Sequence, residues 1–255
     1  MDKLVAGAKK LGWQLTSRQI EQFAIYYREL TEWNQRMNLT AITGYEEVQV
    51  KHFLDALTVS VALKPPIESH YIHAIDIGTG AGIPGLPLKI IFPDMSLVLL
   101  DATAKKASFL RHLIGKLGLD NVEVVVGRAE EVAHLSEYRE KFKLVLSRAV
   151  AALPTLVEFT LPFCAIGGSF VAQKNADICQ EINEAGRAIN LLGGTLKETI
   201  RIEMEELGHE RQLVVIDKLF PTPPQYPRRP GTPERRPLLS TTSNPPKHRT
   251  YCHVQ

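Results

Sequence analysis

The segment from Asp76 to Gly85 limits what this chain can fold into more than any other, because closely spaced glycines stand between an apolar run and a helical pattern. The run from Tyr71 to Ile77 predicts a buried strand, and the stretch from Pro84 to Ile91 predicts a helix whose prolines fall in its first turn. The glycines therefore occupy a strand-to-helix turn, where positive φ angles let a ligand approach free backbone N–H groups. Such a turn is typical of α/β proteins that bind a nucleotide-like cofactor.

The glycine spacing of this turn occurs in two phosphate-binding motifs. A P-loop requires Lys and then Ser or Thr after its last glycine, but Leu86 and Pro87 stand there, so that site is excluded. The dinucleotide pattern GxGxxG is matched from Gly80 to Gly85, and Asp101 follows about 20 residues later as a ribose ligand. An NAD-dependent oxidoreductase therefore remains the alternative.

The tighter pattern GxGxG, formed by Gly78, Gly80 and Gly82, favours S-adenosylmethionine as the cofactor. Asp76 adds a carboxylate two residues before the first glycine. A pyrophosphate is repelled by a nearby carboxylate, whereas the sulfonium, ammonium and ribose hydroxyls of S-adenosylmethionine tolerate or bind one. The turn thus favours a methyltransferase-type site over a dinucleotide site.

Composition bounds the class of protein. The chain has 255 residues, of which 44% are hydrophobic and 23% charged, which is typical of an ordinary globular protein. We expect no membrane span and no secretion signal, and hence a cytoplasmic protein, since there is no long apolar run and the N-terminus turns polar early. The scattered Cys164, Cys179 and Cys252 fit neither a CxxC pair nor a zinc cluster, so no metal site is expected. A monomer is the default expectation.

The chain divides into three predicted parts. Residues 1–70 form a helical region, residues 71–220 the cofactor-binding domain, and residues 221–255 a tail rich in proline and arginine. In the first part, Thr16 to Gln19 fits a capping box, and Ile20, Phe23, Tyr27, Leu30 and Trp33 then recur at helical spacing. A second helix is expected from Glu46 to Leu63, with Lys51, His52 and Asp55 away from its apolar side; we expect His52 to brace the two parts through Asp55 or Asn38.

Alternating strand and helix patterns in residues 71–220 predict a doubly wound α/β sheet of the class I methyltransferase type, with an N-terminal helical extension. The last two strands lack a long helix between them and are expected to form a hairpin, which gives one antiparallel strand at the edge of the sheet. Seven strands are expected at residues 72–77, 96–101, 121–126, 143–148, 168–173, 195–202 and 212–218.

Ligands of such sheets bind beyond the carboxyl ends of the strands, so the residues there are the candidate site. Asp101 is suited to accept hydrogen bonds from both ribose hydroxyls, and Glu130 to hold the adenine amino group. Arg148 and Lys174 follow the fourth and fifth strands and add positive charge at the mouth of the crevice. They are our candidates for substrate positioning, with surface salt bridges as the alternative.

The tail from Pro221 to Gln255 has six Lys or Arg against a single acid and contains nine of the 16 prolines. Such a segment is expected to run extended over the surface or to stay mobile, with its arginines free to meet phosphates. A solubilising tail is the alternative.

Several of these motifs together resemble the RsmG (GidB) family over about residues 20–239. That family consists of bacterial-type enzymes that transfer a methyl group from S-adenosylmethionine to N7 of a guanine in small-subunit (16S) rRNA. The motifs, in chain order, are Asn38 to Ile42, His52 to Leu57, the glycine turn, Gly127 to Glu130, Ser147 to Ala151 and Tyr226 to Pro233.

The resemblance also implies site residues. The chain departs from the family pattern at Ile83, where Phe is frequent, and at Asn175, where Gly follows the lysine; both effects stay open, as does the role of Ser240 to Gln255. Together with the strand-end analysis, the implied cofactor contacts are Gly78, Gly80, Gly82, Ile83, Asp101, Ala102, Thr103, Ala129, Glu130 and Arg148.

The implied reaction needs no general base, because guanine N7 carries a lone pair and no proton. We therefore name no catalytic proton-transfer residue and expect alignment of the reactants to dominate. The expected partner is 16S rRNA or the ribosomal subunit, with a non-catalytic RNA-binding assembly factor as a further alternative. The tail arginines expected to contact RNA are Arg228, Arg229, Arg235 and Arg236.

Overall fold

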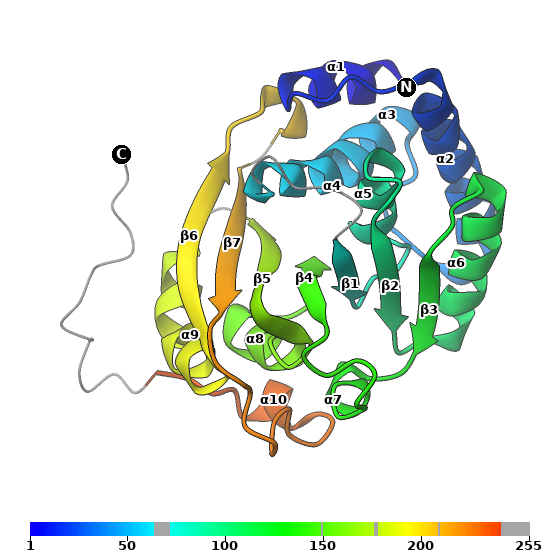
Figure 1. Ribbon diagram of the computed structural model, residues 1–255. Coiled ribbons are helices and arrows are strands. Elements are labelled where there is room, and N and C mark those ends of the chain that lie inside the picture. Colours follow the sequence, from blue (N-terminus) through cyan, green and yellow to red (C-terminus); the bar gives the residue numbers. More distant parts are fainter. Residues whose placement is uncertain (64–71, 149, 176–177, 209, 241–255) are drawn as a thin grey trace.

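The computed structural model describes residues 1–63, 72–148, 150–175, 178–208 and 210–240, and it contains the predicted seven-stranded sheet (Figure 1). The strand order is β3-β2-β1-β4-β5-β7-β6. The strands are β1 (His73–Ile77), β2 (Ser96–Asp101), β3 (Val122–Val126), β4 (Phe142–Arg148), β5 (Cys164–Asn175), β6 (Gly194–Ile202) and β7 (Arg211–Lys218).

The strand directions follow the prediction, but the antiparallel strand is not at the edge as expected, because the hairpin pairs its second strand β7 with β5 and leaves β6 outermost. Strands β1 to β5 pair in parallel, while β7 lies antiparallel between β5 and β6. The β6–β7 hairpin was expected because no long helix separates the two strands. The strand order places β1 between β2 and β4, so the carboxyl end of β1 lies where the sheet changes winding direction.

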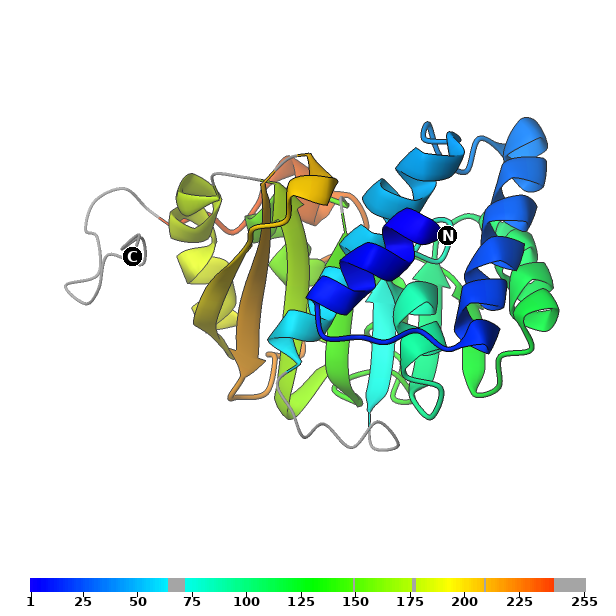
Figure 2. The same ribbon diagram turned by 90° about the horizontal axis from the view of Figure 1, so that it is seen from above.

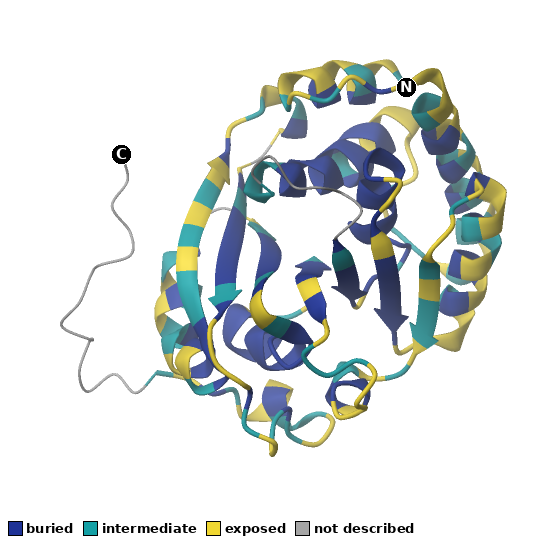
Figure 3. Ribbon diagram, viewed as in Figure 1, coloured by how far each residue is buried: buried dark blue, intermediate teal, exposed yellow. Residues whose placement is uncertain are grey.

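Two hydrophobic cores cover the two faces of the sheet. Leu97 and Leu99 of β2 pack on one face, while Val98 and Leu100 pack on the other, as the two-residue period of a strand requires. Figure 3 shows the inner strands β1, β2 and β7 mostly buried, whereas the edge strands β3 and β6 are partly exposed. The first face carries α1 (Asp2–Lys10), α2 (Ser17–Met37), the helical segment 45–62, α5 (Gly85–Ile91) and α6 (Ala104–Leu117), and the second carries α7 (Ala129–Val132), α8 (Leu153–Thr160) and α9 (Cys179–Leu191).

The N-terminal helices share the first core with the sheet (Figure 2). The capping box at the start of α2 is confirmed, since the Thr16 hydroxyl accepts from Gln19 N and the Gln19 side chain accepts from Thr16 N. Of the expected stripe on α2, Phe23 and Leu30 are buried. Tyr26, which was not part of that stripe, is fully buried as well.

The second predicted helix is present but irregular. It runs through α3 (Tyr45–Val48), a π-helical turn (Gln49–Leu54), α4 (Asp55–Leu57) and a 3₁₀ turn (Thr58–Ala62). The expectation that His52 and Asp55 lie off its buried side is wrong, because both are buried. A π turn changes the angular spacing of side chains, and this segment is enclosed by α1 and the sheet, so a regular helical period misassigned its faces.

Part of the tail is fixed on the second face of the sheet. Arg139 donates to the carbonyl oxygens of Thr222 and Tyr226 at 3.0 and 2.9 Å, and α10 (Thr232–Arg235) lies beside α8. Residues 241–255 of the predicted tail, and the expected domain boundary near residue 70, lie outside the described residues. Among the helices of the described ranges, none is long and apolar enough to cross a membrane.

Candidate cofactor site at the carboxyl ends of the strands

The glycine turn joins β1 to α5 and adopts the backbone shape that its glycines allow. Gly78, Gly80 and Gly82 all have positive φ angles, of 68°, 59° and 91°. The Gly78 N–H donates to the carbonyl oxygen of Leu100 at 2.8 Å, so the turn lies against the end of β2. A Cβ atom at Gly82 would lie 2.9 Å from the Tyr26 hydroxyl, which leaves no room for a side chain.

The carboxylate of Asp76 joins two parts of the glycine turn by hydrogen bonds. One of its carboxylate oxygens, Oδ2, accepts from the Thr79 hydroxyl at 2.7 Å and from the Gly85 N–H at 2.9 Å. The other, Oδ1, is buried and has no hydrogen-bond partner among the described residues. Burial raises the pKa of Asp76 to about 6, against the two hydrogen bonds that lower it. The turn thus contains a buried oxygen that can accept from a ligand donor.

Asp101 ends β2 and is 6% exposed. Its Oδ2 accepts from the Gly80 N–H at 3.0 Å, and its Oδ1 accepts from the Thr103 N–H at 2.9 Å. Oδ2 also accepts from Lys106 Nζ at 3.5 Å. Because each carboxylate oxygen accepts up to two hydrogen bonds, Oδ1 retains capacity for a hydroxyl donor. Ala102 and Thr103 are exposed beside it, as a ligand contact requires.

The residues after β3 meet the C-terminal segment. Glu130, in the first turn of α7, is 6% exposed, and its Oε1 accepts from the Gly231 N–H at 3.1 Å. Ala129 is half-buried next to it. Ile83, from the glycine turn, is 5% exposed and belongs to the first core. The sequence pattern did not indicate the contact between Glu130 and the tail, because 101 residues separate the two partners.

Arg148 is held at the end of β4 by the helical region. Its Nη1 donates to Asp55 Oδ2 at 2.9 Å and to the carbonyl oxygen of Lys51 at 3.1 Å, and its Nη2 lies 3.3 Å from His52 Nδ1. Asp55 is fully buried, and Arg211 pairs with the same carboxylate through Nε at 2.6 Å and Nη2 at 2.9 Å. The alternative of a surface salt bridge at Arg148 does not describe this buried cluster.

Strand periodicity explains why these partners meet. Arg148 continues the alternation of Leu144 and Leu146, and Arg211 continues that of Leu213, so both side chains project toward the face that carries the N-terminal helices. Asp55 enters from that face. The pairing of Asp55 with Arg148 was not predicted, although Asp55 lies within the His52 to Leu57 motif.

His52 bridges the helical region and the sheet, as expected, but through other partners. Its Nε2 lies 2.7 Å from the Thr40 hydroxyl, and its Nδ1 faces the Arg148 guanidinium, so neither Asp55 nor Asn38 is the bracing partner. Burial, and then the charge of Arg148, lowers the pKa of His52 to about 4. The ring is therefore neutral at pH 7, and its Nδ1 accepts from Arg148.

Lys174 is the second-last residue of β5, which extends beyond its expected end at residue 173, and its side chain is bound within the protein. Its Nζ donates to the carbonyl oxygen of Ala151 at 2.8 Å and to Glu181 Oε2 at 2.7 Å. The same Glu181 oxygen accepts from the Leu153 N–H at 2.8 Å. Lys174 therefore links α9 to the segment that follows Arg148. Asn175, the second departure from the family pattern, accepts from Arg211 Nη1 at 2.6 Å.

The four predicted RNA-contacting arginines differ in their surroundings. Arg228 forms a two-point ion pair with the fully buried Glu158, through Nε at 2.9 Å and Nη2 at 2.6 Å. The expectation that all tail arginines are free is therefore wrong for Arg228. Arg229, Arg235 and Arg236 are exposed, and their side chains have no hydrogen-bond or ion-pair partner in the described part of the chain.

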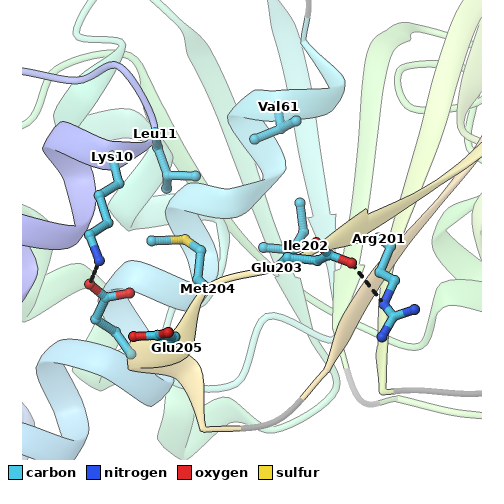
Figure 4. A pocket seen from close by; sticks show the side chains of 9 residues that line it. Lys10, Leu11, Val61, Arg201, Ile202, Glu203, Met204 and Glu205 are labelled. Carbon is cyan, nitrogen blue, oxygen red and sulfur yellow. Dashed lines mark ion pairs between the residues drawn. The ribbon is translucent and has the colours of Figure 1, made fainter.

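A separate pocket of about 310 Å³ lies between the end of α1 and the β6–β7 connection (Figure 4). An ion pair between Lys10 and Glu206 closes one side, and Arg201 pairs with Glu203 at 3.5 Å on the other. None of the predicted cofactor residues lines this pocket. The candidate site is therefore the group of predicted residues at the carboxyl ends of β1, β2 and β4 and not this pocket.

Solved structures share the fold. A mutant of MtNAS in complex with S-adenosylmethionine aligns with a TM-score of 0.51 and 15% identity, covering 80% of this chain and 72% of that one. A putative O-methyltransferase from Klebsiella pneumoniae aligns with a TM-score of 0.51 and 17% identity, covering 77% and 90%. At these identities the likeness concerns the class I methyltransferase fold alone.

Sequence comparison identifies the family. Residues 19–214 match the GidB family, described as rRNA small subunit methyltransferase G. A relative named Ribosomal RNA small subunit methyltransferase G, from Dehalococcoides mccartyi (strain ATCC BAA-2100), is 48% identical over 94% of this chain and 100% of its own length. A relative of the same name from Pelotomaculum thermopropionicum is 47% identical over 91% and 96%. The glycine turn, the strand-end residues and these relatives agree, and the chain belongs to the GidB family of rRNA small subunit methyltransferases.

Proposed function

We propose that this protein transfers the methyl group of S-adenosylmethionine to N7 of a guanine in small-subunit (16S) rRNA. It acts as a monomer in the cytoplasm, on the RNA or the ribosomal subunit. The observation that carries the proposal is the glycine turn at the end of β1, with the orphan oxygen of Asp76 below it and Asp101 beside it. The family match supplies the RNA substrate class.

The residues present fit S-adenosylmethionine. Asp76 Oδ1 is a buried acceptor in need of a donor, and the cofactor carries an ammonium and a sulfonium that favour a nearby carboxylate. Asp101 would accept from the ribose hydroxyls and Glu130 would hold the adenine end. Gly78, Gly80 and Gly82 would allow the close backbone approach that the cofactor needs, and Ile83 would provide an apolar wall.

S-adenosylmethionine supplies an electrophilic methyl group, and the protein supplies alignment. Guanine N7 attacks with its own lone pair, so no residue has to remove a proton. His52 is not a base in this scheme, since it is buried, neutral and hydrogen-bonded to Thr40 and Arg148. The chain's contribution is to hold the two reactants in line and to exclude water around the transferred group.

The RNA would meet the protein beside the Glu130 end of the site. Arg229, Arg235 and Arg236 are exposed and lie within a few residues of Gly231, whose N–H is bonded to Glu130. Three arginines without protein partners are suited to contact phosphates. Arg228 would instead anchor this segment through Glu158.

Methylation of unmodified small-subunit RNA and of ribosomal particles tests the proposal directly. The products are mapped for 7-methylguanosine by chain cleavage, and Asp101→Ala should weaken S-adenosylmethionine binding in calorimetry. Binding of NAD in place of S-adenosylmethionine would favour the oxidoreductase, and cofactor binding without any new modification would favour a non-catalytic assembly factor.

RNA binding is tested separately. Replacing Arg235 and Arg236 by Gln should flatten the salt dependence of RNA affinity while leaving cofactor affinity unchanged. An unchanged salt dependence of RNA affinity would indicate that these arginines serve solubility and do not bind RNA.

A further inference from the structure

The guanidinium of Arg148 is held on one side only. Nη1 donates to Asp55 Oδ2 and to the carbonyl oxygen of Lys51, and Nη2 donates to His52 Nδ1. A guanidinium has five N–H donors, of which these contacts use three. The Nε–H and one Nη2–H therefore have no hydrogen-bond partner among the described residues. Two donors on a planar group suit a carboxylate, which accepts both at once.

Asp55 cannot shift to follow Arg148, because other elements hold it. Arg211 of β7 binds both of its carboxylate oxygens, and Gln173 of β5 donates from Nε2 to its backbone carbonyl at 2.7 Å. The side chain of Asp55 is fully buried, and that of Arg148 is 14% exposed. The guanidinium is thus held by a fixed acceptor, and the side chain that carries the two remaining donors is not fully enclosed.

The position of Arg148 in the sheet selects the end of the cofactor that it meets. Asp101 and Glu130 follow β2 and β3, on one side of β1, while Arg148 follows β4 on the other side. A cofactor that crosses the glycine turn with its ribose at Asp101 would bring its amino-acid end toward Arg148. Burial raises the pKa of Asp76, while the hydrogen bonds from Thr79 and Gly85 and then the charge of Arg148 lower it.

We propose that Asp55 is a positioning residue that fixes Arg148 so that its Nε–H and free Nη2–H bind the carboxylate of S-adenosylmethionine. The carboxylate is the only anionic group of that cofactor, and a guanidinium is its natural partner. This inference rests on the proposed function, since it assumes that S-adenosylmethionine occupies the site. It assigns to the His52 to Leu57 motif a role in cofactor binding without direct contact.

A double-mutant cycle separates positioning from a merely structural role. Cofactor affinity is measured by calorimetry for Arg148→Gln, Asp55→Asn and the double variant, without RNA. We expect each single change to weaken binding about tenfold or more, and Asp55→Asn to add less than threefold in the Arg148→Gln background. The same loss from Asp55→Asn in both backgrounds would show that Asp55 acts on the fold and would overturn the inference.

Arg211→Gln is the comparison variant, because it removes one of the groups that hold Asp55 and leaves the pair with Arg148. It should lower thermal stability and weaken cofactor binding less than Asp55→Asn does, since Gln173 still holds the Asp55 backbone. If Asp55→Asn alone does not fold, it is made in the Arg211→Gln background, where one buried cation has been removed. Loss of affinity relative to Arg211→Gln supports the inference, and no loss overturns it.

Decarboxylated S-adenosylmethionine tests the group that Arg148 binds. Arg148→Gln should weaken binding of S-adenosylmethionine and leave binding of the decarboxylated analogue almost unchanged. Equal weakening for both ligands would overturn the inference while the proposed function stands. Failure of the unchanged protein to bind S-adenosylmethionine would overturn the proposed function itself, and the inference with it.

Discussion

Replacing Tyr26 by Phe removes one hydroxyl that joins α2 to the glycine turn. This hydroxyl donates to the carbonyl oxygen of Ala81 at 2.5 Å, and the side chain is fully buried against Phe53, with ring centroids 5.0 Å apart. Burial raises the pKa of Tyr26 well above its ordinary value, so the hydroxyl keeps its proton and remains a donor. The substitution changes no other atom of the packing.

The expected loss of stability arises because the Ala81 carbonyl oxygen loses its hydrogen-bond donor. Ala81 is 7% exposed, so water cannot easily replace the missing donor, and an unsatisfied buried acceptor costs about 1–3 kcal/mol. With an ordinary urea dependence of about 1–3 kcal/mol per molar, the unfolding midpoint should fall by roughly 1 M. Tyr27→Phe is the matched control, because its hydroxyl donates to the Thr43 carbonyl at 3.3 Å in an exposed position; it should change stability by less than about 0.5 kcal/mol.

Urea unfolding followed by circular dichroism compares the two variants with the unchanged chain. S-adenosylmethionine binding by calorimetry then shows whether the turn keeps its shape, and we expect Tyr26→Phe to weaken it and Tyr27→Phe not to. Equal midpoints for the two variants would refute the reasoning that α2 stabilises the glycine turn through this bond.

Three further changes test other parts of the structure. Arg228→Gln should lower stability by about 3 kcal/mol in thermal unfolding, because Glu158 stays buried without its partner, whereas Arg229→Gln should be neutral. Gly82→Ala should abolish S-adenosylmethionine binding or folding, since residue 82 has a φ of 91° and the added Cβ would lie in occupied space. Retained binding would contradict this. Burial and a neighbouring guanidinium lower the pKa of His52 to about 4, so the unfolded chain binds a proton that the folded chain does not. Relative to His52→Asn, the unchanged protein should lose up to about 3 kcal/mol of stability as the pH falls from 6.5 toward 4, measured by urea titration at each pH.

The features predicted correctly are those that neighbouring residues determine. The capping box at Thr16 is complete within four residues, and the strands were recognised from runs of six to eight residues around turns. The glycine turn is equally local, because positive φ angles and the missing Cβ atoms are properties of the glycines themselves. The strand order was not predicted, because it depends on pairing between strands that are far apart in the chain.

The features that were missed depend on residues far apart in the chain. Asp55 meets Arg211 across 156 positions, and Arg228 meets Glu158 across 70. From sequence alone, a charged residue is expected to be exposed. Whether it is instead buried with a partner depends on how the helices and strands pack. The π turn before Asp55 further displaced it from the side that a regular helix predicts.

The sequence by itself determined the class of the site: a glycine turn after a buried strand, acids at the next strand ends, and a chemistry that needs no proton-transfer group. Tertiary structure alone decided which charges are bound within the protein and which are left for ligands. Arg228 and Lys174 are satisfied by partners, while Asp76 Oδ1 and two donors of Arg148 have none among the described residues. The physical reason is that desolvation and pairing depend on packing between distant elements, which no local pattern records.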